Sequence, residues 1–192
     1  MGPEIGIAKL ALRKQIRAAL EGMTAARRAA ASSEACALLE KQAVWQEARA
    51  ILFYAPLREE LDIWPLVTAA LAAGRTVALP KFDPGSDRYV ACRIQDLTRD
   101  LRRGKFGIRE PNECCAVLPP DQLDLVLVPG VAFDVRGRRL GRGRGFYDRL
   151  LALMRGTTCG VVFDEQIIAQ VPVEPHDARV NCLLTPTRWI EV

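Results

Sequence analysis

The amino-acid sequence predicts a single-domain, three-layer α/β/α fold with a mostly parallel open sheet and N-terminal helices. Short, continuously apolar runs, such as "AILFYAP" (50–56) and "LDLVLVPG" (123–130), are typical of buried parallel strands. Helical segments alternate with these runs, which favours a sheet covered on both faces. The 192 residues, of which 49% are hydrophobic, provide the core of one ordinary domain. We therefore expect one domain over residues 1–192.

The first 45 residues are expected to be helical. The segment "AKLALRKQIRAALEG" (8–22) places Leu12 and Ile16 on one apolar stripe. Thr24 can then cap the N-terminus of a second helix, which we expect from about Ala25 to Ala43.

From residue 50 onward, strands and helices alternate. The run 50–56 ends at Pro56, and Asp62 can cap a helix over 63–74 that tolerates Pro65 in its first turn. The other expected elements are strands at 76–80, 89–94 and 123–130, a helix at 146–154 and a strand at 158–163.

Composition and charge exclude several classes of protein. The 27 basic and 23 acidic residues give a net charge of only +4, too little for a nucleic-acid coat. No apolar run is long enough to span a membrane, and the N-terminus lacks the pattern of a secretory signal. The six cysteines lack zinc-site spacing and are expected to be reduced. We expect a cytoplasmic protein that binds neither nucleic acid nor membrane.

Ligands of such sheets bind beyond the carboxyl ends of the strands. This rule selects three loops: "APLREELD" (55–62), "PGVAFDVRGRRLGRGRG" (129–145) and "FDEQ" (163–166). The middle loop carries the most biased segment of the chain, "RGRRLGRGRGFYDR" (136–149).

This arginine–glycine segment matches none of three known motifs. Phe146 replaces the last glycine of the dinucleotide motif G-x-G-x-x-G, and no register provides the G-K-[ST] that ends a Walker A motif. Tyr147 breaks the RNP1 pattern of RNA-binding domains. An anion site is still favoured. Glycines 141, 143 and 145 allow positive φ, the loop opens into a helix, and arginines alternate with the glycines. Asp148 falls in the first helical turn, where it could hold Mg²⁺. The segment "RGRR" (136–139) is expected to be a turn.

The remaining candidates have two interpretations on spacing alone. Lys9 and Arg13 lie four residues apart, so one helix face could hold a triphosphate, or the pair could simply be a solvated edge. One carboxylate among Glu59, Glu60 and Asp62 could bind a nitrogen-rich heterocycle, or Asp62 could cap a helix while the glutamates lie in solvent. Asp177 could bind metal or cap a helix, and for His176 a structural role is favoured.

Several of these motifs occur together and in one order. "K-x-x-x-R" from Lys9 to Arg13, "YAPLREELD", "VPGVAFDVRGRRLGRGRGFYDR", "FDEQ" and "VPVEPHDARVN" closely resemble the 5-formyltetrahydrofolate cyclo-ligase family, over about residues 8–186. The resemblance implies a monomeric ligase of one-carbon metabolism that needs ATP and Mg²⁺. The ATP γ-phosphoryl group would go to the formyl oxygen of 5-formyltetrahydrofolate. N10 would then attack, and loss of phosphate would leave 5,10-methenyltetrahydrofolate.

The same resemblance implies roles for individual residues. The implied ATP-binding residues are Lys9, Arg13, Arg139, Leu140, Gly141, Arg142, Gly143, Arg144, Gly145, Phe146 and Tyr147. Ala55 and Glu60 would bind the folate, bordered by Arg142, Gly143, Arg144, Gly145 and Phe146. Arg142, Arg144 and Tyr147 would act in catalysis, and Asp148 and Asp177 would bind Mg²⁺.

The chain also departs from the family pattern. Phe146 stands where tyrosine is commoner, Arg144 where a lysine or a small residue occurs, and Asn181 where aspartate is often found. Three alternatives remain open: a folate- or nucleotide-holding protein without turnover, an RNA binder using the arginine–glycine loop, and a sugar-phosphate isomerase or acyl-transfer enzyme of similar architecture. The last would not need ATP.

Overall fold

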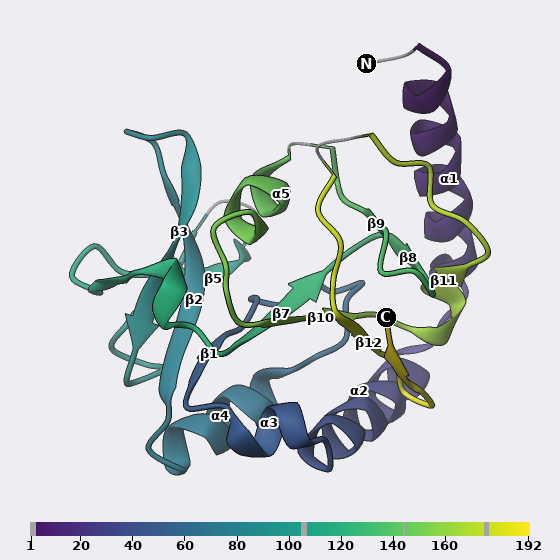
Figure 1. Ribbon diagram of the computed structural model, residues 1–192. Helices are drawn as coiled ribbons and strands as arrows, with labels where there is room; N and C mark the ends of the chain where they lie inside the picture. The colour runs from purple at the N-terminus through teal and green to yellow at the C-terminus, as the bar shows by residue number, and fades with distance from the viewer. Residues whose placement is uncertain (1–2, 105–106, 144, 175–176) are drawn as a thin grey trace.

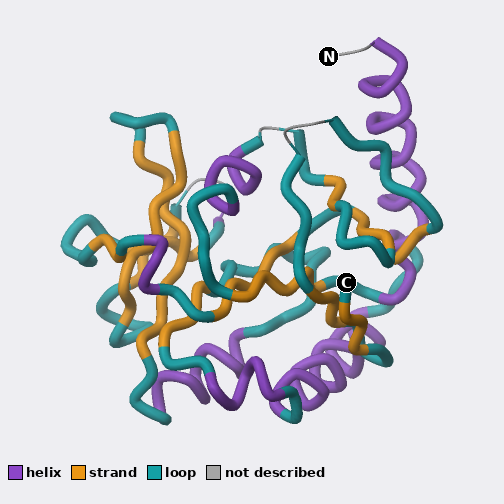
Figure 2. The backbone as a smooth tube through the Cα atoms, in the orientation of Figure 1, coloured by secondary structure: helices purple, strands orange, loops and turns teal. Residues whose placement is uncertain are grey.

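The computed structural model describes residues 3–104, 107–143, 145–174 and 177–192, and it has the expected layers (Figure 1). Helices α2 (Ala25–Glu40), α3 (Ala43–Glu47) and α4 (Trp64–Ala72) cover one side of the sheet, and α5 (Phe146–Leu151) lies on the other. Helix α1 (Pro3–Glu21) runs along one flank of the molecule. Figure 2 shows α2, α3 and α4 as one layer below the strands.

Among the described residues, eight strands form the main sheet, in the order β13-β12-β10-β7-β1-β2-β3-β6. The central strands β12, β10, β7, β1 and β2 pair in parallel, and β13, β3 and β6 add antiparallel edges. The sheet is therefore mostly parallel in its centre and mixed at its edges. The strands are β1 (Ala50–Leu52), β2 (Thr76–Asp83), β3 (Arg88–Ile94), β6 (Val117–Leu118), β7 (Leu125–Pro129), β10 (Thr157–Val161), β12 (Cys182–Leu184) and β13 (Trp189–Glu191).

Two smaller sheets flank the main one. Strands β4 (Leu101–Arg103) and β5 (Arg109–Pro111) form an antiparallel ribbon. Strands β8 (Ala132–Asp134), β9 (Arg139–Leu140) and β11 (Ile167–Ile168) form a three-stranded sheet. Strands β8 and β9 lie between β7 and α5 in the chain, and β11 follows β10. The sequence predicts a single loop over 129–145, so the β8–β9 hairpin is a finding of the structure.

Alternate residues of the buried strands explain why the strands read as continuously apolar. Ile51 of β1 and Leu127 of β7 pack into the core under α2 and α4. Their neighbours Leu52 and Val128 pack on the opposite face, in the core that contains Leu150 of α5. Because both faces of each strand are covered, both sets of side chains must be apolar.

The expected elements are confirmed in kind but differ in length. Strand β1 ends at Leu52 instead of Pro56, and β2 continues to Asp83 instead of ending at Pro80. The sequence did not predict β4, β5, β6, β12 and β13. The first region of helix divides, because the chain leaves the helical path after Glu40 and a separate α3 places Trp45 in the core. The helix expected over 146–154 ends at Leu151. Thr157 already pairs with Leu125 of β7, so the intervening residues must turn. Thr24 caps α2 as expected, since its side chain accepts a hydrogen bond from the Arg27 N–H.

The cysteines form no disulfide bonds, as expected from the sequence. All six cysteines are free, and Cys36, Cys92, Cys159 and Cys182 are buried. No described helix has the length and apolar character needed to cross a membrane.

The turn that joins β8 to β9 is held by a buried ion pair. Asp134 is fully buried, and its Oδ2 accepts a hydrogen bond from Arg138 Nε at 2.6 Å and from the Val171 N–H at 2.8 Å. Its Oδ1 accepts from the N–H groups of Arg136 and Arg138. Gly137, with φ of 71°, supplies the left-handed residue of this turn. The expectation that "RGRR" forms a turn is confirmed.

Candidate nucleotide and substrate site

The three loops selected by the strand-end rule lie at one edge of the sheet. Strands β1, β7 and β10 are neighbours and run parallel, so their carboxyl ends meet there. The short loop after β10 braces the long loop after β7, because Gln166 Nε2 donates hydrogen bonds to the carbonyls of Gly130 and Val131 at 3.1 and 2.9 Å. In the same loop, Asp164 Oδ1 accepts from Thr185, Thr187 and Arg188. This third loop therefore has a supporting role.

Arg139 connects the start of the arginine–glycine loop to α5 through contacts with Asp148 and Tyr147. Its side chain is 4% exposed, and its Nη2 donates to Asp148 Oδ1 at 2.6 Å. The guanidinium also lies 5.6 Å from the ring centroid of Tyr147. Its Nε is buried and has no hydrogen-bond partner among the described residues. The ion pair holds the start of α5 against β9, and Leu140 beside it packs in the core.

The glycines of this loop serve different purposes. Gly143 and Gly145 have φ of 102° and 64°, as expected, and Gly145 is the residue that precedes α5. Gly141 is absent from the described residues with positive φ, so that expectation was wrong for one glycine of three. A Cβ at Gly141 would lie 2.9 Å from Arg139 Nη1, so a larger residue here would have to displace the end of the Arg139 side chain.

Helix α1 contributes two basic residues to the same region. Arg13 Nε donates to the Gly141 carbonyl at 2.9 Å. Lys9 is buried and its Nζ lies 2.6 Å from Asp177 Oδ2 and 3.0 Å from Glu174 Oε2. Burial would lower the pKa of Lys9, but the hydrogen bonds and charges of these two carboxylates outweigh it and raise the pKa above its usual value. Lys9 therefore stays charged.

Arg142 connects the arginine–glycine loop to the loop after β1. Its Nη1 donates to Glu59 Oε1 at 3.1 Å and its Nη2 to Glu60 Oε1 at 2.9 Å. Glu60 Oε2 accepts in turn from the Leu57 N–H at 2.9 Å. Glu60 is largely buried while Arg142 is about half exposed. The two loops expected to hold nucleotide and folate therefore touch through one guanidinium.

Tyr147 lies between these groups as a protonated phenol. Burial raises its pKa, and the charge of Glu60 and the neighbouring Tyr89 raise it further, while Arg139 opposes the shift. The rings of Tyr89 and Tyr147 lie 6.3 Å apart. With a raised pKa, Tyr147 can donate a hydrogen bond but cannot act as a base at neutral pH.

The two carboxylates expected to bind Mg²⁺ each contact a basic side chain: Asp148 contacts Arg139, and Asp177 contacts Lys9. The described residues contain no group of three or more histidine, cysteine, aspartate or glutamate side chains that could hold a metal ion. Mg²⁺ bound with a nucleotide is held by one or two carboxylates together with phosphate oxygens. The oxygen donors of Asp148 and Asp177 therefore fit this ion.

Some expected site residues have no described geometry. Arg144, His176 and the side chain of Phe146 lie outside the described residues. Ala55 follows β1 and is half-buried, beside the loop that carries Glu60. Asn181 Oδ1 accepts hydrogen bonds from the N–H and hydroxyl of Thr158, so this residue ties β10 to the start of β12.

Sequence reasoning missed two residues that contact the site and one, Asp134, that holds the turn leading to it. Glu174 binds Lys9, and Glu59 binds Arg142, but neither was assigned a role. Asp134 was read as part of an ordinary turn although it is fully buried. Its position directly after an apolar strand and four residues before Arg138 was the available signal.

Comparisons with known proteins give one consistent result. The model of the 5-formyltetrahydrofolate cyclo-ligase family matches residues 6–186. The 5-formyltetrahydrofolate cyclo-ligase of Mycolicibacterium smegmatis is 32% identical over 163 residues, which cover 74% of this chain and 76% of the relative. That of Escherichia coli K12 is 35% identical over 133 residues, covering 67% and 73%. The NMR structure of Aquifex aeolicus 5,10-methenyltetrahydrofolate synthetase is similar with a TM-score of 0.85 and 30% identity, covering 95% of this chain and 92% of that one.

Proposed function

This chain belongs to the 5-formyltetrahydrofolate cyclo-ligase family, and from that premise we propose which of its loops bind ATP and which bind the folate. The protein converts 5-formyltetrahydrofolate to 5,10-methenyltetrahydrofolate, and its use of ATP follows from the family. We propose that the loop from Arg139 to Tyr147 binds ATP and that the loop after β1 binds the folate. The contact of Arg142 with Glu59 and Glu60 is the observation that carries this proposal.

In the proposed nucleotide site, Lys9 and Arg13 act from α1 together with the whole loop from Arg139 to Tyr147. The Arg13 hydrogen bond to the Gly141 carbonyl supports this, because it ties α1 to the loop. The positive φ of Gly143 and Gly145 leaves the backbone of the loop open to close approach by phosphates. Arg142 and Arg144 would neutralise charge on the phosphates.

In the proposed folate site, Glu60 accepts hydrogen bonds from the pterin and Ala55 forms part of the wall, with Arg142 to Phe146 as the border to ATP. In the structure, Arg142 donates a hydrogen bond to the Glu60 carboxylate. Binding of an anionic phosphate beside Arg142 would compete with Glu59 and Glu60 for its guanidinium. Nucleotide binding would thereby release Glu60 toward the folate.

The proposed reaction proceeds in two steps. The γ-phosphoryl group of ATP is transferred to the formyl oxygen, which makes a leaving group of an otherwise unreactive amide-like oxygen. N10 of the substrate then attacks the formyl carbon and gives up its proton. The bond between this carbon and the phosphorylated oxygen breaks, and phosphate leaves as the five-membered ring closes. Phosphoryl transfer needs positioning and positive charge more than protein bases. Arg142, Arg144 and the protonated Tyr147 have that character.

We further propose that Mg²⁺ is held by Asp148 and Asp177. When bound, this ion would neutralise charge on the ATP phosphates. The chain's own contribution is to orient the two carboxylates, Asp148 through Arg139 and Asp177 through Lys9.

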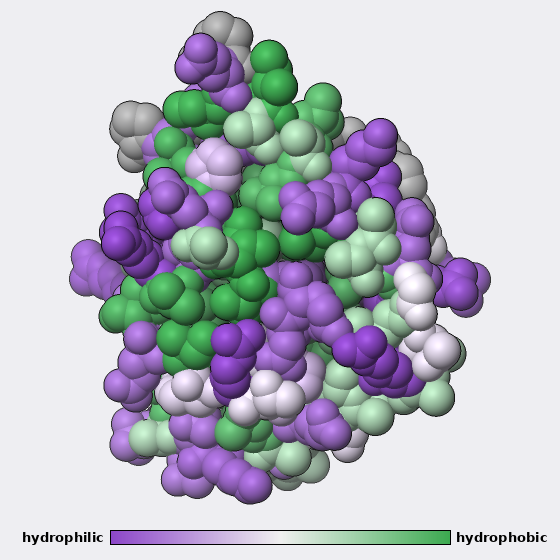
Figure 3. Space-filling model, turned by 90° about the vertical axis from the view of Figure 1, so that its right-hand side faces the viewer, coloured by the Kyte–Doolittle hydropathy of each residue, from purple (hydrophilic) through white to green (hydrophobic). Residues whose placement is uncertain are grey.

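We also propose that the chain acts as one domain over 1–192, as a monomer in the cytoplasm, without nucleic acid or membrane partners. Figure 3 shows the face that carries α1, where hydrophobic side chains gather in the middle and hydrophilic ones surround them. Two strongly exposed apolar residues, Ile7 and Leu10, lie on this helix, and Val117, Val135 and Leu153 are scattered on other elements. We propose that these apolar side chains do not join two copies of the chain. A molar mass twice that of the chain in light scattering would contradict it.

Omission of ATP is the direct test of the function. With ATP and Mg²⁺, we expect 5-formyltetrahydrofolate to be converted to the methenyl product, followed by the absorbance of that product. Without ATP we expect no product, because the formyl oxygen cannot leave unphosphorylated. Removal of Mg²⁺ with a chelator should also stop turnover. Product formed without ATP would contradict the proposal.

Replacing Arg142 with alanine should weaken ATP binding about tenfold or more, since a charge-assisted hydrogen bond contributes roughly 1.5–3 kcal/mol and this side chain is half exposed. Isothermal titration with ATP and Mg²⁺ would measure the change. Arg142→Lys keeps the charge and should recover part of the affinity. Arg136→Ala, which removes an exposed arginine from the β8–β9 turn, is the matched control and should bind ATP normally. Equal ATP affinities for Arg142→Ala and the wild type would exclude the role.

A further inference from the structure

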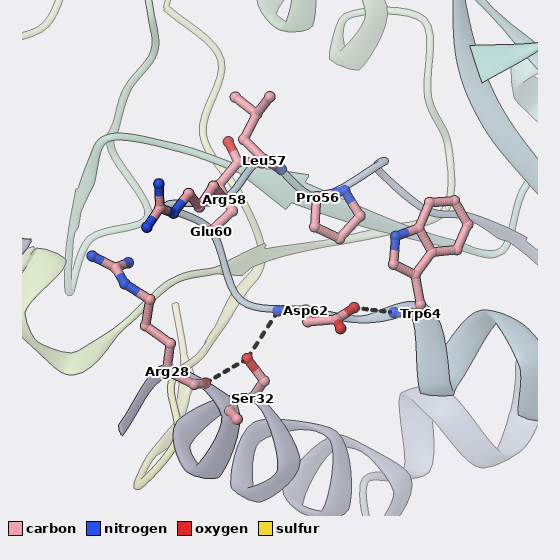
Figure 4. A pocket seen from close by; sticks show the side chains of 9 residues that line it. Arg28, Ser32, Pro56, Leu57, Arg58, Glu60, Asp62 and Trp64 are labelled. Atoms are coloured by element: carbon pink, nitrogen blue, oxygen red, sulfur yellow. Dashed lines mark hydrogen bonds between the residues drawn. The ribbon is translucent and has the colours of Figure 1, made fainter. Parts of the chain in front are cut away.

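A hollow of about 380 Å³ lies beside the loop after β1, on the side that faces α2 (Figure 4). Glu60 belongs to its wall, so the hollow adjoins the proposed folate site. Its apolar wall consists of Pro56, Leu57 and the indole of Trp64. The other lining residues are Arg28, Ala29, Ser32, Arg58 and Asp62.

Two arginines from different elements stand at one end of this hollow. Arg28 comes from α2 and Arg58 from the loop, and Figure 4 shows their guanidinium groups on the same side, turned toward each other. Arg28 is anchored, because its Nη2 donates to the Leu20 carbonyl at 2.5 Å and its guanidinium lies 5.7 Å from the Phe163 ring centroid.

Both guanidinium groups have unused donors. Arg28 Nη1 is buried and has no hydrogen-bond partner among the described residues. Arg58 is exposed and makes no hydrogen bond or ion pair with any described residue. A buried N–H of a guanidinium without an acceptor is costly, so an acceptor from outside the chain, such as a water, an ion or a ligand, is expected to satisfy it.

The nearby carboxylates already have partners. Glu60 binds Arg142 and the Leu57 N–H, and Asp62 accepts from the Trp64 N–H at 2.9 Å. Glu165 pairs with Arg27, the neighbour of Arg28 on α2. None of these carboxylates forms an ion pair with Arg28 or Arg58, so both guanidinium groups are available to an anion.

We propose that Arg28 and Arg58 form an anion subsite that binds a carboxylate of the glutamyl end of the folate substrate. This inference rests on the proposed position of the folate beside the loop after β1. At neutral pH the glutamyl carboxylates are the fixed negative charges of this substrate, and two guanidinium forks match a carboxylate. The apolar side chains of Pro56, Leu57 and Trp64 suit the aromatic ring that joins the pterin to the glutamate.

The test compares two substrates that differ only in the glutamyl residue: 5-formyltetrahydrofolate and 5-formyltetrahydropteroate. We expect Arg58→Ala to raise the KM for the first compound about tenfold and to leave its kcat and the KM for the second compound unchanged. Arg28→Ala should act in the same direction. Arg58→Lys should recover part of the loss. Arg27→Ala is the matched control, because Arg27 pairs with Glu165 and does not line the hollow.

Arg28→Ala also removes the hydrogen bond to the Leu20 carbonyl, so the thermal unfolding of this variant is measured as well. Arg58 makes no such bond, so Arg58→Ala still tests the proposal if Arg28→Ala fails to fold. Equal rises in KM for both compounds, or no rise for either, would overturn the proposal. Inorganic phosphate is the second probe. Phosphate could inhibit the reaction of both compounds to the same extent, in the wild type and in Arg58→Ala alike. This result would place the bound phosphate in the ATP loop and would overturn the proposed subsite.

The same comparison can be made by equilibrium binding of the two compounds without ATP. A wild-type protein that binds both compounds but never turns them over would contradict the proposed function alone. A wild-type protein that does not distinguish them would contradict the subsite alone. The two failures are therefore separable.

Discussion

Asp148→Ala should lower kcat/KM by about a hundredfold or more, which is the size of effect seen when one preorganised charge of a phosphoryl or acyl site is removed. The residue has two tasks. Its carboxylate neutralises the buried Arg139 guanidinium at 2.6 Å, which positions α5 and Tyr147, and we propose that it also binds Mg²⁺. Steady-state rates at increasing Mg²⁺ concentration would measure the loss.

Asp148→Asn separates the two tasks. The amide oxygen can still accept the hydrogen bond of Arg139, but it is a poor Mg²⁺ ligand. We expect Asp148→Asn to keep more thermal stability than Asp148→Ala and to lose most of the activity. Asp148→Ala should lose both, because Arg139 Nη2 is then left without a hydrogen-bond acceptor as well as without a counter-charge. Binding of ATP without Mg²⁺ should be preserved in Asp148→Asn. Near-normal rates for that variant at ordinary Mg²⁺ would rule out the metal role.

Asp134→Ala should destabilise the fold by roughly 3–5 kcal/mol, the cost of breaking a buried ion pair by removing one partner. The carboxylate is fully buried and satisfies Arg138 Nε as well as the N–H groups of Arg136, Arg138 and Val171. Chemical denaturation of the variant would measure the change in the free energy of unfolding.

The control for Asp134 is the double variant Asp134→Ala with Arg138→Ala. Removing both charges should cost less than the sum of the two single changes, because neither partner is then left as an uncompensated buried charge. The Val171 and Arg136 N–H groups still lose their acceptor, so recovery should be partial. Strict additivity of the two single changes would show that the pair does not interact.

How far the sequence could be read depended on the distance between the interacting residues. Thr24 was correctly assigned as the cap of α2, because its partner Arg27 is three residues away. Gly143 and Gly145 were correctly expected at positive φ. The β8–β9 hairpin was missed, since its strands have only three and two residues and their alternation is too short to be recognised. The expectation of positive φ at Gly141 was wrong. What is special at this glycine is the nearby Arg139 Nη1, a contact that exists only in the folded chain.

The family resemblance named the candidate residues but not their contacts with one another. Lys9 and Asp177 were expected to bind ATP and Mg²⁺ separately, and in the structure they bind each other at 2.6 Å. Arg142 was expected at the phosphates, and it lies against Glu59 and Glu60. In the structure, Lys9 and Arg142 are therefore paired with carboxylates.

Local chemistry in the chain specifies the layers of the fold, the parallel centre of the sheet and the edge at which the loops gather. Continuously apolar runs require cover on both faces, and parallel strands place their carboxyl ends together. Which side chains meet at that edge is a separate matter. Lys9 and Asp177 are 168 positions apart, and Arg142 and Glu60 are 82 apart. Only the tertiary packing that brings α1 to Asp177, and the arginine–glycine loop to the loop after β1, decides these contacts. The hydrophobic periodicity of a segment does not show which distant residue its polar side chains will meet.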